Sequence, residues 1–335
     1  MAVAGEATAG GVRIGLSAVV MTLRPRPAAA GHRGPRAAAV PELCVLTTDG
    51  GGTPALPFGP FDPVNDRTFE LSLRRFVEAQ TGFRPGFVEQ LYTFGDAGRD
   101  APRASPGPER LREVSVGYLA LARDVSTSRL LSSAPGRAEA RWTPVLDVFP
   151  WEDRRGGGMT PPDLAEGLMG WAGSDAARRD RAAALFALEE GARWNEERAL
   201  ERYELLYEAG LVQETGRDRG TSEAAGPGLA LASDHRRILA TGLGRLRGKV
   251  KYRPVLFELT AETFTLSELQ GAAEAVSGLT LHKQNFRRGV ERTGLVAATG
   301  RLSSATGGRP AELFRFTTAD LRGGQAPGLA LPAQR

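Results

Sequence analysis

The sequence predicts an α+β chain in which a strand-rich part comes first, a helical segment follows, and a basic unit ends the chain. Three observations support this order. Strand-like apolar runs dominate residues 15–123, helical periodicity dominates residues 150–219, and short, well-delimited elements follow residue 250. A length of 335 residues with 41% hydrophobic and 24% charged residues suits one large or two ordinary globular domains.

The N-terminal part contains four predicted strands and one helix. Residues 15–25, 41–48, 87–94 and 112–123 are rich in apolar residues and are separated by polar, Gly-rich or Pro-rich segments. At the first of these segments, the apolar run from Ile14 to Leu23 is interrupted by Gly15, Ser17 and Thr22. It is followed by Arg24 and Arg26, without a small-residue cleavage site. A strand that enters a domain therefore explains it better than a signal peptide does.

The helix of this part is predicted from a cap at Asp66 to about Gln80, with Gly82 ending it. Its apolar side chains recur at helical spacing. The segment at about 150–219 then predicts helices at 161–173 and 175–212. Its alternating Arg and Glu residues favour a solvated, salt-bridged surface. Residues 214–228 predict a flexible loop, and a new helix is expected from a cap at Ser233 or Asp234.

The C-terminal unit has the most specific pattern. Thr265, followed by Glu268, forms a predicted capping box before a helix that Gly278 ends. A second helix is expected at about residues 282–293, with Phe286 and Val290 facing the core. Residues 295–299 and 311–316 alternate like strands around a basic, Gly-rich tip. Two helices joined by a tight turn and followed by such a hairpin match a winged helix-turn-helix.

Positive charge gathers in this unit. Residues 245–322 carry 13 Lys and Arg side chains against 7 Asp and Glu, whereas the whole chain has a net charge of only +4. Such a patch provides the salt-dependent phosphate contacts of DNA binding, and Gln, Asn and Arg can read base edges in the major groove. The predicted DNA-binding residues come from the second helix and the wing: Lys283, Gln284, Asn285, Arg287, Arg288, Arg301 and Arg309. The alternative is a winged helix used for protein contacts, with a basic face that only keeps it soluble.

Composition excludes several other classes of protein. The single cysteine, Cys44, cannot form an internal disulfide, and with three histidines the chain lacks the ligands of a typical structural zinc site. Cys44 lies in an apolar, strand-like run, so core packing is a better explanation than a reactive thiol. No apolar stretch approaches the roughly 18 residues of a membrane span. We therefore expect a cytoplasmic protein without a metal or membrane partner.

The C-terminal half also resembles a known family. Five segments occur in its order, "RLRGK", "Y.P..FEL", "FTLSELQ", "NFRR" and "GRPAELFRF". Together they are similar to the Nudix-related transcriptional regulators of NAD metabolism of the NrtR type. Residues 90–100 and 115–121 resemble the Nudix-like domain of the same family, and the helical segment resembles its longer alphaproteobacterial members. The resemblance implies a Nudix-like α/β/α sandwich over residues 1–249, with the helical insertion at about 150–219, and a winged helix-turn-helix domain over residues 250–325.

Nudix hydrolases hold Mg²⁺ with the glutamates of a sequence motif called the Nudix box. The resemblance implies that residues 67–83 of this chain correspond to that box from its first glutamate onward. Alignment places Arg75 at the arginine of the box and Gly82 and Phe83 at its end. The box glutamates are replaced by other residues: Arg67, Phe76, Ala79 and Gln80. Asp66 and Glu70 lie nearby but do not restore the pair of acids on the helix, and Glu78 occupies a variable position. We therefore expect no catalytic and no metal-binding residues.

The resulting prediction is a DNA-binding regulator that represses NAD biosynthesis or salvage genes. Its catalytically inactive Nudix-like domain is expected to sense a nucleotide such as ADP-ribose, NAD or ATP, with no other cofactor, and its effector-binding residues are unknown. A homodimer on a double-stranded operator is expected, because two recognition helices read two half-sites. Two alternatives are a Nudix hydrolase of nucleotide diphosphates with an accessory domain, and a protein-interaction scaffold built on an inactive Nudix core.

Overall fold

The computed structural model describes residues 11–26, 40–49, 52–95, 112–123, 139–221, 226–303 and 310–317. A mixed sheet at its centre has the strand order β3-β2-β1-β6-β5, with β4 paired to β1 and β7 paired to β2. The central strands β1 and β6 are parallel along Val12 to Thr22, whereas the other pairs in this sheet are antiparallel. The strand bounds are β1 Val12–Pro25, β2 Pro41–Asp49, β3 Pro54–Ala55, β4 Phe58–Pro60, β5 Phe87–Phe94, β6 Arg112–Ala122 and β7 Ala140–Pro144.

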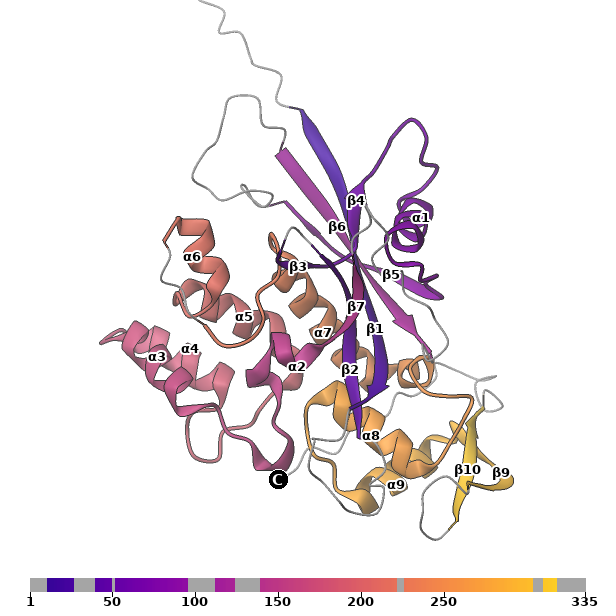
Figure 1. Ribbon diagram of the computed structural model, residues 1–335. Helices are drawn as coiled ribbons and strands as arrows, with labels where there is room; N and C mark the ends of the chain where they lie inside the picture. The colour runs from indigo at the N-terminus through magenta and orange to yellow at the C-terminus, as the bar shows by residue number, and fades with distance from the viewer. Residues whose placement is uncertain are drawn as a thin grey trace, which may run out of the picture.

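Helices cover both faces of this sheet (Figure 1). The helix α1, Phe69–Thr81, packs against β1 and β4 on one face, and α7, His235–Tyr252, packs against β1, β5 and β6 on the other. Alternate residues of β1 serve the two layers, since Leu16 and Val20 join the core around α1 while Val19 joins the core around α7. The arrangement is the α/β/α sandwich that the sequence predicts.

The start of α1 differs from the expectation. Its N-cap is Thr68, whose hydroxyl accepts a hydrogen bond from the Leu71 amide at 3.2 Å. Asp66 instead accepts hydrogen bonds from the Ser72 hydroxyl at 2.6 Å and from the Asp62 amide at 3.0 Å. The predicted cap was therefore wrong by two residues, because the carboxylate stabilises the loop before the helix. Gly82 ends α1 in the left-handed conformation, with φ 72°, as predicted.

The helical insertion lies between β7 and α7, at one side of the sheet (Figure 1). The predicted helix over 175–212 is in fact two α-helices, because Ala187 adopts a φ of 50° and ends the first. The predicted flexible loop at 214–228 was also wrong at its beginning, where α6 forms. The elements are α2 Val145–Val148, η1 Pro150–Glu152, η2 Arg155–Gly157, α3 Pro162–Ala172, α4 Ala176–Phe186, η3 Glu196–Arg198, α5 Ala199–Glu208 and α6 Gln213–Arg219.

Long-range contacts explain α6. Its Glu214 is buried and accepts a hydrogen bond from the Leu231 amide at 3.2 Å, and its carboxylate pairs with the buried Arg236 at 3.2 Å. The Thr215 hydroxyl donates to the Tyr207 carbonyl at 3.0 Å. These partners come from α5, α7 and the segment between α6 and α7, so local sequence patterns could not reveal them.

The C-terminal unit has the predicted order of elements. Two helices are followed by a hairpin, and a short strand that the sequence analysis missed, β8, completes a sheet with the order β8-β10-β9. The tip of the hairpin, residues 304–309, lies outside the described residues. The element bounds are η4 Val255–Glu258, β8 Thr263–Phe264, α8 Leu266–Ser277, α9 Lys283–Thr293, β9 Val296–Ser303 and β10 Ala311–Phe316.

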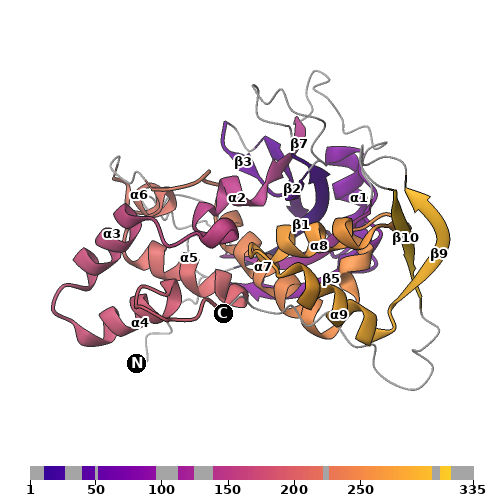
Figure 2. The same ribbon diagram turned by 90° about the horizontal axis from the view of Figure 1, so that it is seen from below.

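The winged helix packs directly on the sandwich. Helix α8 lies against β2, and a Cβ atom on Gly271 would lie only 3.0 Å from the Pro41 ring (Figures 1 and 2). One continuous apolar core includes Val19 of β1, Leu269 of α8 and Phe286 of α9. Within the described part of the chain, no helix is long and apolar enough to cross a membrane.

Candidate nucleic-acid interface

The first helix of the C-terminal unit, α8, has the predicted capping box. The Thr265 hydroxyl accepts from the Glu268 amide at 3.1 Å, and the Glu268 carboxylate accepts from the Thr265 amide at 2.7 Å. Gly278 ends the helix with a φ of 72°. These reciprocal bonds satisfy amides that have no partner within the helix and fix where α8 begins.

The second helix, α9, is held by an apolar face. Phe286 and Val290 are 2% and 1% exposed, and Leu281, just before the helix, is equally buried. Residues four apart lie on one side of a helix, so these two anchors leave the opposite side of α9 at the surface. Gly294 ends α9 in the left-handed conformation, with φ 64°.

The outer face of α9 is polar and basic. Four of the predicted residues on the helix, Lys283, Gln284, Asn285 and Arg288, are exposed. Arg292, which is not among the predicted contacts, is also exposed and lies one turn after Arg288. We call the exposed residues of this helix the α9 outer face: Lys283, Gln284, Asn285, Arg288, Glu291 and Arg292.

The cations of α9 have no acidic partner among the residues that the structure describes. None of the four, Lys283, Arg287, Arg288 and Arg292, has a side-chain nitrogen within 4.0 Å of a described carboxylate. Glu291 shares the outer face but pairs with none of them. The positive charge of this helix is therefore available to a negatively charged partner.

Arg287 occupies a different position from its neighbour Arg288. It is half-buried at the flank of the helix, and its Nε is enclosed without a hydrogen-bond partner among the described residues. Its angular position, about 100° from Phe286, explains this placement. In the wing, Arg301 is exposed on β9 directly after Gly300, and Arg315 is exposed on β10, whereas Arg309 lies outside the described residues.

The charged side chains of α1, the helix in which the Nudix box was predicted, are paired. Arg75 contacts the Asp66 carboxylate at 2.6 Å, Arg74 contacts Glu70 at 2.8 Å, and Arg84 contacts Glu78 at 2.5 Å. The hydrogen bond from Ser72, with that from the Asp62 amide, lowers the pKa of Asp66.

Asp66, Glu70 and Glu78 therefore do not fit a Mg²⁺ site, since each lies beside a guanidinium group. Among the described residues, no group of three or more His, Cys, Asp or Glu is arranged to hold a metal ion. Cys44 is 3% exposed, and burial raises the pKa of its thiol to about 12. A thiol in this environment packs in the core, as the sequence analysis predicted.

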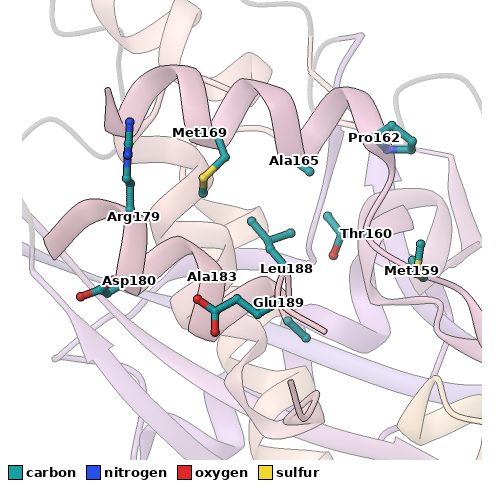
Figure 3. Close-up of a pocket in the computed structure, with 11 residues that line it drawn as sticks. Met159, Thr160, Pro162, Ala165, Met169, Arg179, Asp180, Ala183, Leu188 and Glu189 are labelled. Atoms are coloured by element: carbon teal, nitrogen blue, oxygen red, sulfur yellow. The ribbon is translucent and has the colours of Figure 1, made fainter. Parts of the chain in front are cut away.

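A groove of about 640 Å³ lies between α3 and α4 in the insertion (Figure 3). Its walls are largely apolar, with Met159, Met169 and Leu188 among them. The ionisable residues at its edge are one arginine, Arg179, and two acids, Asp180 and Glu189. An edge with more carboxylates than guanidinium groups does not favour a diphosphate, so we do not assign a nucleotide to this groove.

Comparison with known proteins supports both parts of the chain. Residues 256–316 match the family described as the NrtR DNA-binding winged helix domain. A curated relative from Acinetobacter baylyi, the ADPR responsive transcriptional repressor NtrR, is 39% identical over 92 residues. That alignment covers 28% of this chain and only 36% of the relative.

Two solved structures share the fold over most of the chain. The crystal structure of Shewanella oneidensis NrtR matches with a TM-score of 0.51 and 22% identity, over 91% of this chain and 94% of that one. A MutT/nudix family protein from Enterococcus faecalis matches with a TM-score of 0.50 and 18% identity, over 92% of this chain and 88% of that one. At these identities the likeness concerns the fold alone.

The fold and the interface define the class of protein, which is a Nudix-fold domain joined to a winged helix-turn-helix domain. Within that class the C-terminal domain matches the NrtR DNA-binding winged helix domain, and the fold of the whole chain is similar to that of NrtR. The resemblance found in the sequence is thereby confirmed.

Proposed function

We propose that this protein is a DNA-binding transcriptional repressor whose Nudix-like domain senses a nucleotide. The observation that carries the proposal is the α9 outer face, where exposed cations have no carboxylate partner among the described residues. The position of this helix within a domain of the NrtR DNA-binding family adds support. In a helix-turn-helix, the second helix enters the major groove and its exposed side chains meet the bases and the backbone.

We infer separate roles for the predicted contacts. Arg288 and Arg292 lie on the exposed side of α9, and a guanidinium group can donate two hydrogen bonds to a guanine edge. Gln284 and Asn285 can donate to and accept from adenine in the same way. Lys283 and the half-buried Arg287 at the helix flank suit phosphate contacts, as do Arg301 and Arg309 in the wing.

The proposed division of labour follows the two parts of the chain, with a sensor over residues 1–249 and a DNA reader over residues 250–325. The boundary falls inside α7, His235–Tyr252, which packs on both parts. We propose a homodimer, since two recognition helices about one DNA turn apart would read a two-fold operator.

The effector that we propose is a nucleotide of the ADP-ribose type, and the regulated genes are those of NAD biosynthesis or salvage. The name of the Acinetobacter baylyi relative supports the effector, because that repressor is described as ADPR responsive. We propose no hydrolysis, since Phe76, Ala79 and Gln80 stand where the Nudix box has acids and the acids nearest to α1 pair with arginines.

Fluorescence anisotropy with the full chain tests DNA binding. Labelled duplexes from the region upstream of its own gene and from NAD-biosynthesis promoters should bind at low salt, with an affinity that falls steeply as salt rises. Absence of binding to every duplex at low salt would contradict the proposal. The double variant Arg287→Ala, Arg288→Ala should lose binding, whereas a protein-interaction scaffold would keep its partner.

A thermal shift panel of ADP-ribose, NAD and ATP tests the sensor, since a ligand that binds the native state raises its melting temperature. The same nucleotides with Mg²⁺ should show no turnover. Hydrolysis that is abolished by EDTA would replace the regulator with the hydrolase alternative.

A further inference from the structure

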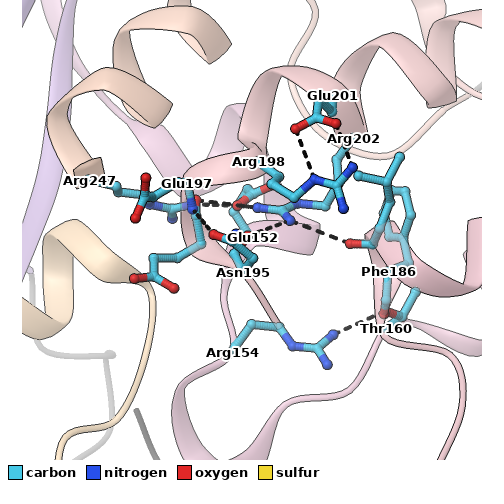
Figure 4. Close-up of polar contacts among 12 residues, drawn as sticks. Glu152, Arg154, Thr160, Phe186, Asn195, Glu197, Arg198, Glu201, Arg202 and Arg247 are labelled. Atoms are coloured by element: carbon cyan, nitrogen blue, oxygen red, sulfur yellow. Dashed lines mark hydrogen bonds and ion pairs between the residues drawn. The ribbon is translucent and has the colours of Figure 1, made fainter. Parts of the chain in front are cut away.

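A buried carboxylate joins three segments of the chain beneath the DNA-binding domain (Figure 4). Glu152, at the end of η1, accepts from Arg202 of α5 at 2.6 and 2.9 Å and also from Arg247 of α7. Glu152 and Arg202 are fully buried, and Arg247 is 2% exposed. Burial by itself would raise the pKa of Glu152, but Arg247 and Arg202 more than offset it, so the pKa lies below its usual value.

Arg247 extends this cluster to the first helix of the winged helix domain. Its Nε donates to the carbonyl of Val276 at 2.9 Å, and Nη1 also donates to the carbonyl of Glu196 at 2.9 Å. Val276 lies in the last turn of α8, where carbonyl groups have no partner within the helix. A guanidinium group at that position satisfies the free carbonyl and interacts favourably with the helix dipole.

The segment after Glu152 is bonded to the turn between α8 and α9. The amide of Arg154 donates to the Gly278 carbonyl at 2.8 Å, and the amide of Gly156 donates to the Thr280 hydroxyl at 2.8 Å. A Cβ atom on Gly278 would lie 2.3 Å from the Glu152 carbonyl oxygen, so the two backbones approach as closely as glycine allows. We call residues 152–156, together with Arg247, the latch.

The turn is held from its other side by α8. The Glu274 carboxylate accepts from the Leu281 amide at 2.9 Å, and the Gln270 side chain donates to the Leu281 carbonyl at 2.9 Å. Leu281 is two residues before the first residue of α9. The turn that contacts the latch is therefore also bonded to α8 immediately before α9 begins.

The latch also contacts the wall of the groove in the insertion (Figures 3 and 4). The Arg154 guanidinium donates to the Thr160 hydroxyl at 3.0 Å and lies 4.4 Å from the ring centre of Trp194. Thr160 lines the groove and donates to the Phe186 carbonyl at 2.7 Å. A continuous set of directed contacts thus runs from the groove between α3 and α4 to the turn before α9.

We propose that the latch sets the position of α9 relative to the Nudix-like sandwich, with Glu152 and Arg247 as positioning residues. The inference rests on the proposed DNA-binding function and assigns to the helical insertion the regulation of that site. Buried ion pairs contribute little net stability compared with packed apolar groups, but their directed bonds fix geometry. A change in the insertion that displaces the latch would therefore change DNA affinity through α9.

Amide hydrogen exchange in Glu152→Gln, measured on the full chain without DNA, tests the positioning. Peptides covering residues 276–282 should exchange at least about tenfold faster than in the wild type, because loss of the latch permits local opening. Peptides from β1 and β6 should be unchanged, which shows that the sandwich remains folded. The matched control is Glu201→Gln, whose carboxylate pairs with Arg198 at 2.6 Å on the exposed side of the same insertion. Unchanged exchange at residues 276–282 in Glu152→Gln would overturn the proposal.

A second variant applies if Glu152→Gln does not fold. Thr280→Val removes the acceptor of the Gly156 amide at nearly constant volume, and Thr280→Ser restores a hydroxyl. Exchange of residues 152–158 should rise in Thr280→Val and return to the wild-type rate in Thr280→Ser. Equal exchange in all three proteins would overturn the proposal.

DNA binding provides the readout that a purely structural role would not change. Glu152→Gln, or Thr280→Val in its place, should bind the operator about tenfold more weakly than wild type with the same salt dependence, since the cations of α9 remain. Unchanged affinity would overturn the role of the latch in positioning α9. A wild-type protein that binds no DNA would contradict the proposed function, while the exchange experiment would still decide whether the latch holds the turn.

Discussion

Three arginines of the insertion and those of α9 have opposite surroundings. In the insertion, Arg181, Arg198 and Arg202 each meet a carboxylate at 2.5–2.6 Å, and Arg202 is fully buried with its partner. In α9, Arg288 and Arg292 are exposed and have no carboxylate partner within the described residues. Both segments are rich in arginine, so the count of charges does not distinguish them. The two groups differ in whether a carboxylate lies close to the guanidinium group. An arginine without a neighbouring carboxylate keeps its positive charge available for a phosphate.

The greatest difference between the buried and the exposed arginines is expected in protein stability. Glu152→Ala leaves the guanidinium groups of Arg202 and Arg247 buried without their counter-charge, which should cost about 3–5 kcal/mol in the free energy of unfolding. Urea unfolding measures it, with Glu201→Ala as the matched control. The exposed pair of Glu201 should change stability by no more than about 1 kcal/mol. Similar values for the two variants would remove the distinction between the buried and the exposed pair.

The next effect is on DNA affinity. Arg288→Ala should weaken operator binding by about 1–3 kcal/mol, because the side chain is exposed on the α9 outer face and has no acid to neutralise it. Arg198→Ala, in the insertion, removes an equal charge whose partner is Glu201 and should leave the affinity unchanged. Anisotropy titrations at two salt concentrations measure both. An equal loss in the two variants would mean that the total charge, rather than its place, governs binding.

A smaller effect is expected from the capping box of α8. Thr265→Ala removes the acceptor of the Glu268 amide and should lower the free energy of unfolding by about 0.5–2 kcal/mol. Thr265→Ser keeps the hydroxyl oxygen and should therefore retain most of the wild-type free energy of unfolding. Thermal unfolding followed by circular dichroism is suitable. If Thr265→Ala leaves the free energy of unfolding unchanged, packing on the sandwich rather than the capping box determines the stability of α8.

The smallest effect concerns Cys44, where we expect no reaction in the folded protein. Its pKa is raised to about 12 by burial, so the thiolate, which is the reactive form, appears only as pH rises through that value. At pH 8 iodoacetamide should modify Cys44 in urea but not in the native state, as mass spectrometry would show. Rapid alkylation of the native protein would contradict the buried position.

The elements that were predicted well are those with local determinants. The capping box at Thr265, the spacing of Phe286 and Val290, and the glycines at 82, 278 and 294 define helix ends and faces within a few residues of chain. The sequence also predicted the order of elements in the winged helix and most of the exposed residues of α9, whereas the predicted Arg287 is half-buried. It missed Arg292 as a contact candidate, although its spacing of four from Arg288 places both on one side.

The sequence by itself determined the class of the C-terminal domain and the polarity of α9, because periodicity, caps and residue types are local properties. The tertiary structure alone decided which charges are paired. Glu152 meets Arg202 and Arg247 across 50 and 95 residues of sequence, and the Gly156 amide meets Thr280 across 124. Such contacts arise only when distant elements pack together and exclude water, so a solvated surface predicted from alternating Arg and Glu became, around Arg202, a buried junction beneath the DNA-binding domain.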